Sequence, residues 1–477
     1  MHCRSPKPAM LALALFLASC ATAPETTVPV PEPVPTETRL PPLTSRDHGR
    51  ILAAFGGEYS APTVERLASE ILERLAAASD KPDQRYRLTI LNSPSINAFA
   101  LPSGHLYITR GMLALINDVS EFAAVLGHEI AHVSARHASQ REDQVRTSEL
   151  VAVMRARLLN DMAGAEARRE AARVSLASFS RTQEVEADVI GVALVAKAGY
   201  DPYGASRFLQ TMDRNAALRT RSQAAAGGPD FMASHPSTPD RIREAILAAR
   251  QHMAPEGRPR DRERYLRAIE GITFGDDPRQ GFVRGRSFVH PRLGFTVTAP
   301  EGFTLENSRS AVTGLGPNEM AIRLDVVRVQ ANQALTSYLS SGWIDGLSET
   351  TVEAVTVNGF QAATAVARGS DWSFRIFVVR FGSEVYRIIY AARDLNGEVD
   401  ASFRASMETF RRLTAAEAAV KPIRVRTIRA GEGDTVLTFA RRMQVPDRAE
   451  ERFRVLNGLS DGEQPRGGEL VKYVAEQ

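Results

Sequence analysis

The stretch Leu126-Gly127-His128-Glu129-Ile130-Ala131-His132 decides the fold of the first half of this chain. Apolar residues recur around it with a period of 3.6, which predicts a buried helix with Ser120 as its N-cap. Residues four apart share one side of a helix, so His128 and His132 can offer two ring nitrogens to one metal ion. Glu129 would face the same ion and could pass a proton from a bound water to a leaving amine.

A catalytic zinc site of this kind needs a third protein ligand and one position for water. The metzincin pattern requires a Gly seven residues and a His ten residues after His128, but Ala135 and Ala138 occupy those positions. If the helix continues, His137 lies about 140° round from His132 and is expected at the surface or behind the ligands. The other option is an acidic ligand from a separate helix.

Residues 182–191 (TQEVEADVIG) supply that acidic residue. Glu184 and Asp188 are four residues apart on one helical face, and the apolar run that follows continues the helix into a core. Glu184 can bind the metal, while Asp188 can accept the N–H of a metal-bound imidazole. Glu186 points elsewhere and is expected to be a surface charge. These residues predict one Zn²⁺ per chain.

Composition limits the classes of protein and of metal site. The chain has 477 residues, which suggests about three domains, and its 43% hydrophobic and 24% charged residues are typical of globular proteins. The net charge of +3 is too balanced to predict a nucleic-acid partner. Both cysteines, Cys3 and Cys20, fall within the first 20 residues. A metal site beyond them must use His, Asp or Glu.

The N-terminus predicts a lipid anchor. Met10 to Ala18 is a short apolar run that suits a signal-peptide core and is too short to span a bilayer. Leu17-Ala18-Ser19-Cys20 resembles a bacterial lipobox, in which the cysteine is lipidated after cleavage; the alternative is an ordinary secretory signal with an incidental cysteine. Residues 20–45 are rich in proline and predict a semi-rigid spacer. We expect a lipoprotein on the periplasmic face of the bacterial envelope, and Ala21 resembles outer-membrane sorting.

Shifts in composition and periodicity divide the chain into a signal segment, a spacer, three folded parts and one linker. These are 1–19, 20–45, 46–253, 254–281 (linker), 282–413 and 423–474. Within 46–253, the turn Pro102-Ser103-Gly104 predicts a short hairpin. Residues 282–413 are expected to be α+β, because 372–393 predict a hairpin through Gly382-Ser383 and 401–413 predict a helix. This part shows no catalytic constellation.

The last folded part resembles the LysM pattern. Its Gly433-Asp434-Thr435, Leu456-Asn457 and closing Gly468-Glu469-Leu470-Val471 carry the resemblance. LysM modules bind N-acetylglucosamine-containing glycans, so the resemblance implies peptidoglycan as a partner. The alternative is a small βαβ appendage with no glycan site.

His-Glu-x-x-His followed some fifty residues later by Glu-x-x-Ala-Asp resembles the gluzincin family that contains the CAAX prenyl endopeptidases, HtpX and BepA. Residues 97–104 (NAFALPSG) resemble the family's edge strand beside the cleft, and 234–242 (SHPSTPDRI) resemble its His-Pro-x-x-x-x-Arg-Ile segment. The implied fold class is α+β multidomain: a mainly helical zincin peptidase domain with a small edge sheet, then an α+β domain and a LysM-like βαβ domain.

The resemblance also implies roles for individual residues. His128, His132 and Glu184 would bind zinc, Glu129 would be the general base, and Asp188 would orient a ligand. His235 would lie near the metal and either stabilise the oxyanion or occupy the open position at rest; a structural helix-capping turn is the alternative. Arg241 is expected to be a buried partner for an acidic group.

Two departures from the family concern substrate delivery. The CAAX endopeptidases and HtpX span the membrane several times, and no later stretch of this chain approaches the ~18 consecutive apolar residues required. BepA-type members carry helical repeats, and no period of about 34 residues occurs here. The insert 139–181 is expected to be either a lid or a plain amphipathic helix pair.

The sequence therefore predicts a zinc endopeptidase of the cell envelope that acts in quality control or processing. Its expected substrates are unfolded or misassembled envelope proteins. The alternative is a cell-wall-bound chaperone or scaffold with latent proteolysis. A peptidoglycan hydrolase is a third hypothesis and rests only on the LysM resemblance.

Overall fold

The computed structural model describes residues 45–140, 180–221, 235, 238–254, 257–307 and 311–476. The predicted signal segment, the lipobox with Cys20 and the proline-rich spacer lie outside the described residues, as does nearly all of the predicted insert 139–181. Among the described helices, none combines the length and the apolar character needed to cross a membrane.

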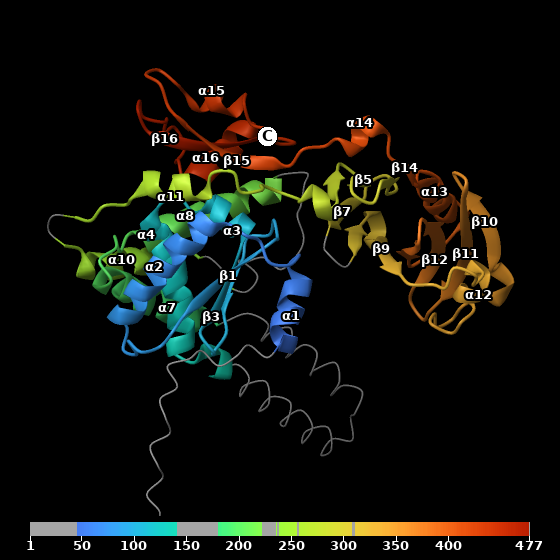
Figure 1. Ribbon diagram of the computed structural model, residues 1–477, viewed down its shortest axis with the longest axis horizontal. Coiled ribbons are helices and arrows are strands. Elements are labelled where there is room, and N and C mark those ends of the chain that lie inside the picture. Colours follow the sequence, from blue (N-terminus) through green and yellow to red (C-terminus); the bar gives the residue numbers. More distant parts are fainter. Residues whose placement is uncertain are drawn as a thin grey trace, which may run out of the picture. The chain divides into compact units, whose positions relative to one another are not determined.

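The first folded part is built from helices around a small sheet (Figure 1). Its described helices are α1 (Ser45–Ala54), α2 (Pro62–Ala78), α3 (Arg110–Leu115), α4 (Val119–Ser134), α7 (Arg181–Lys197), α8 (Gly204–Arg221), α10 (Pro239–His252) and α11 (Arg262–Ile269). Buried apolar residues of α2, α3, α4, α7, α8 and α11 meet in one core, and Ala248 and Ala249 of α10 pack in a separate small cluster with Val192 of α7. The segment expected as a linker includes α11, whose Tyr265 and Leu266 are fully buried in that core.

The small sheet carries the predicted hairpin. Strands β1 (Arg87–Leu91), β2 (Ala98–Ala100) and β3 (His105–Thr109) lie in the order β1-β3-β2. The strand β1 runs parallel to β3, and β2 runs antiparallel to it. Gly104 has φ +88° in the turn, a conformation that glycine adopts without steric cost. The prediction of a hairpin is confirmed, and it leaves β2 at the edge of the sheet.

The cap predicted for the metal-site helix is wrong. Asp118, in extended conformation, is the N-cap of α4, and its side chain accepts a hydrogen bond from the backbone N–H of Glu121 at 2.7 Å. Ser120 lies inside the first turn, where its hydroxyl accepts the N–H of Asp201 at 3.1 Å. Both residue types favour N-caps, so the position of the helix start had to come from tertiary contacts.

Two glycines bring α4 and α7 close together (Figure 1). A Cβ on Gly191 would stand 3.1 Å from the backbone nitrogen of His128 and 3.2 Å from its Cα. A Cβ on Gly127 would stand 3.0 Å from the Val195 side chain. Because neither glycine has a side chain, the α7 backbone approaches α4 beside the first histidine of the motif.

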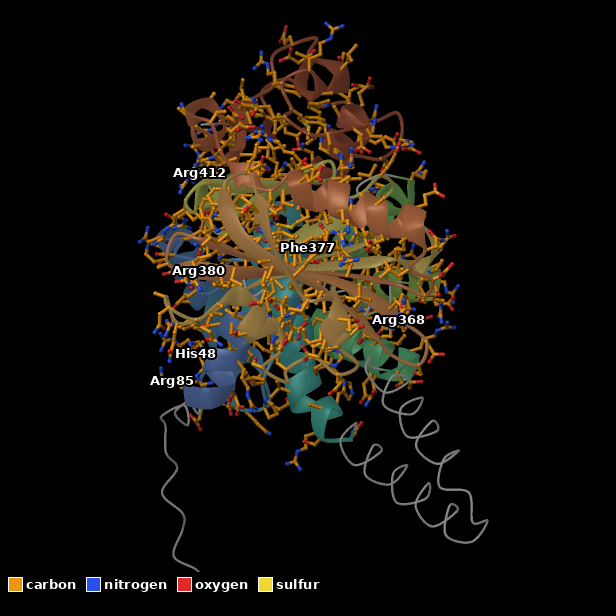
Figure 2. All side chains as sticks on the ribbon, turned by 90° about the vertical axis from the view of Figure 1, so that its right-hand side faces the viewer. His48, Arg85, Arg368, Phe377, Arg380 and Arg412 are labelled. Carbon is orange, nitrogen blue, oxygen red and sulfur yellow. The ribbon has the colours of Figure 1, made fainter. Side chains whose placement is uncertain are left out.

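Between residues 282 and 413 the chain forms two sheets and short helices, consistent with the predicted α+β class. The larger sheet has the order β10-β11-β12-β13-β9-β8-β7 and the smaller one β14-β6-β5-β4. Their strands are β4 (Phe282–Arg284), β5 (Ser287–His290), β6 (Phe295–Thr298), β7 (Thr304–Asn307), β8 (Val312–Leu315), β9 (Ala321–Val327), β10 (Glu353–Val357), β11 (Phe360–Arg368), β12 (Ser373–Phe381), β13 (Glu384–Ala392) and β14 (Arg411–Arg412). Figure 2 looks onto this domain, with Phe377 near the middle of the larger sheet and Arg368 and Arg380 toward its margins.

The hairpin predicted in this domain is confirmed, and the predicted helix is shifted. Strands β12 and β13 pair through a Gly382-Ser383 turn, in which Gly382 has φ +65°. The helix expected at 401–413 is α13 (Gly397–Glu408), while α12 (Leu335–Leu339) packs on the other face of the sheet. Helix α13 begins earlier than predicted because Asn396 is its N-cap and accepts hydrogen bonds from the backbone N–H groups of Glu398 and Val399. The end of the expected helix is instead β14, paired with β6.

The C-terminal part has two helices between its strands where one was expected. Strand β15 (Ile423–Arg429), preceded by α14 (Ala415–Ala418), pairs antiparallel with β16 (Leu470–Glu476). Helices α15 (Val436–Ala440) and α16 (Ala449–Asn457) lie between them in sequence. The prediction of a βαβ unit is therefore wrong in its helix count, because the stretch after Val445 folds as α16. Its Phe453 packs against Phe439 of α15.

Candidate metal centre

Four buried side chains from three segments point their donor atoms at one another. His128, His132, Glu184 and His235 each offer one donor, and these four atoms lie within 4.8 Å of one another. The Nε2 atoms of His128 and His132 are 3.0 Å apart, and His235 Nδ1 is 3.3 Å from His128 Nε2. Glu184 Oε1 lies 2.9 Å from His235 Nδ1 and 3.5 Å from His132 Nε2.

These spacings fit a zinc ion. Ligand atoms at 2.0–2.1 Å in tetrahedral geometry are separated by roughly 3.4 Å. The measured donor separations of 2.9 to 3.5 Å bracket that value. Imidazole and carboxylate donors also match zinc in chemical type. The cluster could therefore hold a zinc ion, and the structure brings the three predicted ligands and His235 together.

Asp188 and Arg241 support the cluster from behind. Asp188 Oδ1 lies 3.0 Å from His128 Nδ1, the nitrogen on the far side of the ring from the cluster. Arg241 donates two hydrogen bonds to the same carboxylate, from Nε to Oδ2 at 2.7 Å and from Nη2 to Oδ1 at 2.9 Å. Its Nη1 also lies 2.8 Å from Glu184 Oε2. Arg241 is 1% exposed, as expected for a buried partner of acidic groups.

Burial and the neighbouring charges shift the ionisation of these groups. Burial lowers the pKa of His128 and of His132, and for His132 the adjacent His128 lowers the pKa further. Burial acts to raise the pKa of Asp188, but the hydrogen bonds from Arg241 and His128 outweigh it and lower that pKa. Asp188 therefore stays ionised and can hold the N–H of His128.

Glu129 lies between the cluster and the edge strand β2. It is 2% exposed, and the backbone of Ala100 hydrogen-bonds its carboxyl group. No group in the described part of the chain hydrogen-bonds its other oxygen, Oε1. Burial first, and then Glu184, raises the pKa of Glu129 well above its usual range. A buried carboxyl with one uncommitted oxygen can exchange a proton with a reacting group.

His235 does not cap a helix. The N-cap of α10 is Thr238, whose side chain accepts the backbone N–H of Arg241. His235 precedes it and turns its ring into the cluster, where it is 2% exposed. The helix-capping alternative for His235 is therefore wrong.

Of the two positions expected for His137, at the surface or behind the ligands, the structure shows the second. Helix α4 ends at Ser134, and Arg136 has φ +57°, so the chain turns back and does not continue around the helix. His137 is fully buried, and its Nδ1 lies 2.9 Å from Nδ1 of His132. Its Nε2 lies 3.4 Å from Oε2 of Glu186, which remains an exposed carboxylate. No Gly or Pro marks this helix end, so no local signal could have revealed it.

Comparison with known proteins shows which enzyme family the part of the chain around the cluster resembles. The family model "Peptidase family M48" matches residues 62–248, the range that holds every residue of the cluster. Residues 62–248 are similar to this peptidase family and are referred to as the M48 domain. The domain begins at the first residue of α2 and ends within α10.

Proteins similar to this part of the chain include a metalloendopeptidase and beta-barrel assembly-enhancing proteases. The mitochondrial metalloendopeptidase OMA1 of Schizosaccharomyces pombe is 34% identical over 37% of this chain and 50% of its own length. The beta-barrel assembly-enhancing proteases of Yersinia pestis and Escherichia coli are 30% and 28% identical, over 40% of this chain and 40% of their own lengths. The chain thus spans half or less of these relatives.

A solved structure from Bacteroides thetaiotaomicron aligns with 41% of this chain and 88% of its own, at 10% identity and a TM-score of 0.24. A TM-score this low carries no argument about the fold.

Proposed function

We propose that this chain is a zinc-dependent endopeptidase of the bacterial cell envelope, acting on unfolded or misassembled envelope proteins in quality control or processing. One observation carries the proposal: the donors of His128, His132 and Glu184 converge beside the buried carboxyl of Glu129, inside an M48 domain. The two relatives named beta-barrel assembly-enhancing protease support a role at the outer membrane.

The chemistry follows from the placement of the protein groups. A zinc ion held by His128, His132 and Glu184 would supply Lewis acidity to a water and to the scissile carbonyl. Glu129 accepts a proton from the attacking water and delivers it to the leaving amine. Asp188 fixes the ring orientation of His128 through Nδ1.

The edge strand β2 offers a binding mode for an extended substrate. Strand β2 lies at the margin of its sheet, and its Ala100 backbone contacts the Glu129 carboxyl. A substrate strand that pairs with β2 would bring its peptide bond next to the general base, in the manner of β-strand addition.

His235 favours the second candidate, a chaperone or scaffold with latent proteolysis. Its Nδ1 occupies the fourth corner of the donor cluster, the position that a catalytic zinc site leaves for water. At rest the site would thus be closed, and His235 would have to leave before cleavage. Once displaced, its ring could stabilise the oxyanion.

The substitution Glu129→Gln tests the proposed function. Zinc content should be unchanged, and cleavage of casein or of an unfolded outer-membrane protein should fall by about 10²–10⁴-fold, because general acid–base catalysis contributes that much. Glu73→Gln, the same change on the exposed face of α2, is the matched control. Retained cleavage by the Glu129→Gln protein would refute the assignment. If that protein cleaves nothing but still complements a deletion strain, the chaperone is the main function.

We also propose that Cys20 carries the lipid that anchors the chain to the periplasmic face of the envelope, and that residues 423–474 bind peptidoglycan. The lipobox string and the Gly433-Asp434-Thr435 and Leu456-Asn457 motifs support these proposals. Co-sedimentation of the protein with purified sacculi tests the second proposal. Failure to sediment above the level of a sacculus-free control would refute it.

A further inference from the structure

The nitrogen of His132 that faces away from the donor cluster meets a second histidine. His132 directs Nε2 toward His128 Nε2 at 3.0 Å, and its Nδ1 lies 2.9 Å from His137 Nδ1. Both rings are almost completely enclosed, with exposed fractions of 5% and 0%. A pair of ring nitrogens at this distance needs one proton between them, because two bare nitrogens or two N–H groups repel.

When Nε2 of His132 binds a metal, the protons on the ring nitrogens of His132 and His137 can be placed in one way only. A metal-bound Nε2 leaves Nδ1 of the neutral ring protonated, so Nδ1 is the donor. His137 Nδ1 must then accept, and its proton resides on Nε2. That nitrogen points to Glu186 Oε2 at 3.4 Å, and a carboxylate oxygen can only accept. The row His132–His137–Glu186 thus has one consistent direction, from the metal ligand outward.

Carboxylates of helix α7 therefore support both metal-binding imidazoles, one directly and one through His137. Asp188 contacts Nδ1 of His128 directly at 3.0 Å. Nδ1 of His132 contacts His137 instead, and His137 lies between His132 and Glu186. The turn at Arg136, with φ +57°, places His137 in the bridging position.

We propose that His137 and Glu186 are positioning residues that hold His132 in the tautomer whose Nε2 binds the metal. The inference rests on the zinc site of the proposed function and adds two residues to it. His137 supplies the acceptor for His132, and Glu186 sets the tautomer of His137 from the surface.

A matched pair at His137 separates hydrogen bonding from packing. Asn and Leu have nearly the same branched shape, but Asn places an amide oxygen where His137 has Nδ1 and can accept from His132. We expect His137→Leu to weaken zinc binding about 10–100-fold, the usual loss for an outer partner of a metal-bound histidine, and His137→Asn to stay within about threefold of wild type. Competition with a chromophoric chelator measures both. Equal affinities for the two variants, whether both high or both low, would overturn the role of His137.

Glu186 allows a second test that does not threaten the fold, because its side chain is 54% exposed. Glu186→Gln keeps an acceptor oxygen and should bind zinc within about twofold of wild type. Glu186→Lys presents a donor to His137 Nε2 and should weaken zinc binding at least about threefold. The control for its charge is Glu244→Lys, at a carboxylate on α10 near Arg243.

The outcomes distinguish this inference from the proposed function. If Glu186→Lys and Glu244→Lys have the same affinity for zinc, the role of Glu186 is overturned. If wild-type protein binds no stoichiometric zinc, the proposed function itself fails. If wild type binds zinc tightly and His137→Leu does so equally well, the proposed function stands and the positioning role falls.

Discussion

At the scale of single residues, three carboxylates of α7 lie close to the histidines of the candidate metal centre or to His137 behind it. Glu184 points into the donor cluster, Asp188 meets His128, and Glu186 meets His137. Helical spacing predicted that Glu184 and Asp188 share one face of their helix, because residues four apart lie on the same side. The third contact depends on the end of another helix, which periodicity does not report.

Asp277 gives a pH-dependent prediction at this scale. Burial acts to raise its pKa, but hydrogen bonds from Arg279 and Asn92 outweigh it and lower the pKa from 3.8 to about 2. A lowered carboxyl pKa stabilises the fold above about pH 4, and this contribution is lost as the pH falls through 2. Asp277→Asn should lower the free energy of unfolding by roughly 1–3 kcal/mol at pH 6.

Denaturant unfolding at pH 6 and in steps down to pH 2 measures the difference between wild type and Asp277→Asn. The difference in stability should shrink toward pH 2, because about half of the wild-type carboxyl groups are protonated there. A difference that stays constant with pH would contradict the ionic account of Asp277.

At the scale of elements, the crossing of α4 and α7 positions the metal centre. Gly191 lets α7 approach the backbone of His128, and Glu184 lies two turns earlier on the same helix. Gly191→Val would place side-chain carbon against His128 backbone that cannot move independently. We expect the free energy of unfolding to fall by roughly 1–3 kcal/mol, as for an overpacked core, and zinc affinity to fall with it.

The control for Gly191→Val is Gly397→Val, at an exposed first position of α13 where an added Cβ meets nothing within 4 Å. Its stability should stay within about 0.5 kcal/mol of wild type. Thermal or denaturant unfolding of both variants, with zinc titration, decides the point. Equal stability of the two variants would show that the crossing tolerates a side chain.

At the scale of the whole molecule, the C-terminal part shares a core with the M48 domain. Val425, Phe439 and Phe453 belong to the same buried apolar cluster as residues of α2 and α4. Lys472 of β16 is fully buried, and its Nζ donates to the carbonyl oxygens of Ala114 at 2.6 Å and of Ile116 at 2.5 Å. These carbonyls end α3, so the last strand of the chain caps a helix of the M48 domain.

Lys472→Met should therefore destabilise the protein. The variant keeps the aliphatic length of the side chain but leaves the carbonyl oxygens of α3 without their buried donor, at a cost of about 1–3 kcal/mol. Lys81→Met, at an exposed lysine, should change stability by less than about 0.5 kcal/mol. Chemical denaturation of both variants measures the difference, and equal stabilities would show that Lys472 contributes nothing as a cap.

The sequence by itself determined the elements with a strong period or turn signal: the buried helix α4, the hairpin β2–β3, and the hairpin β12–β13. It also placed His128 and His132 on one helical face and Glu184 and Asp188 on another, because spacing along a helix fixes which side chains share a face. Such signals are local, and local geometry is enough to express them.

Only the tertiary structure decided the rest. Asp118 rather than Ser120 caps α4, and His137 contacts His132. Lys472 hydrogen-bonds the carbonyl of Ile116 at the end of α3, more than 350 positions earlier in the chain. Each of these contacts joins groups whose proximity is set by packing between elements. A periodic pattern reports which face of one helix is buried, but the partner that covers the face is chosen by the fold as a whole.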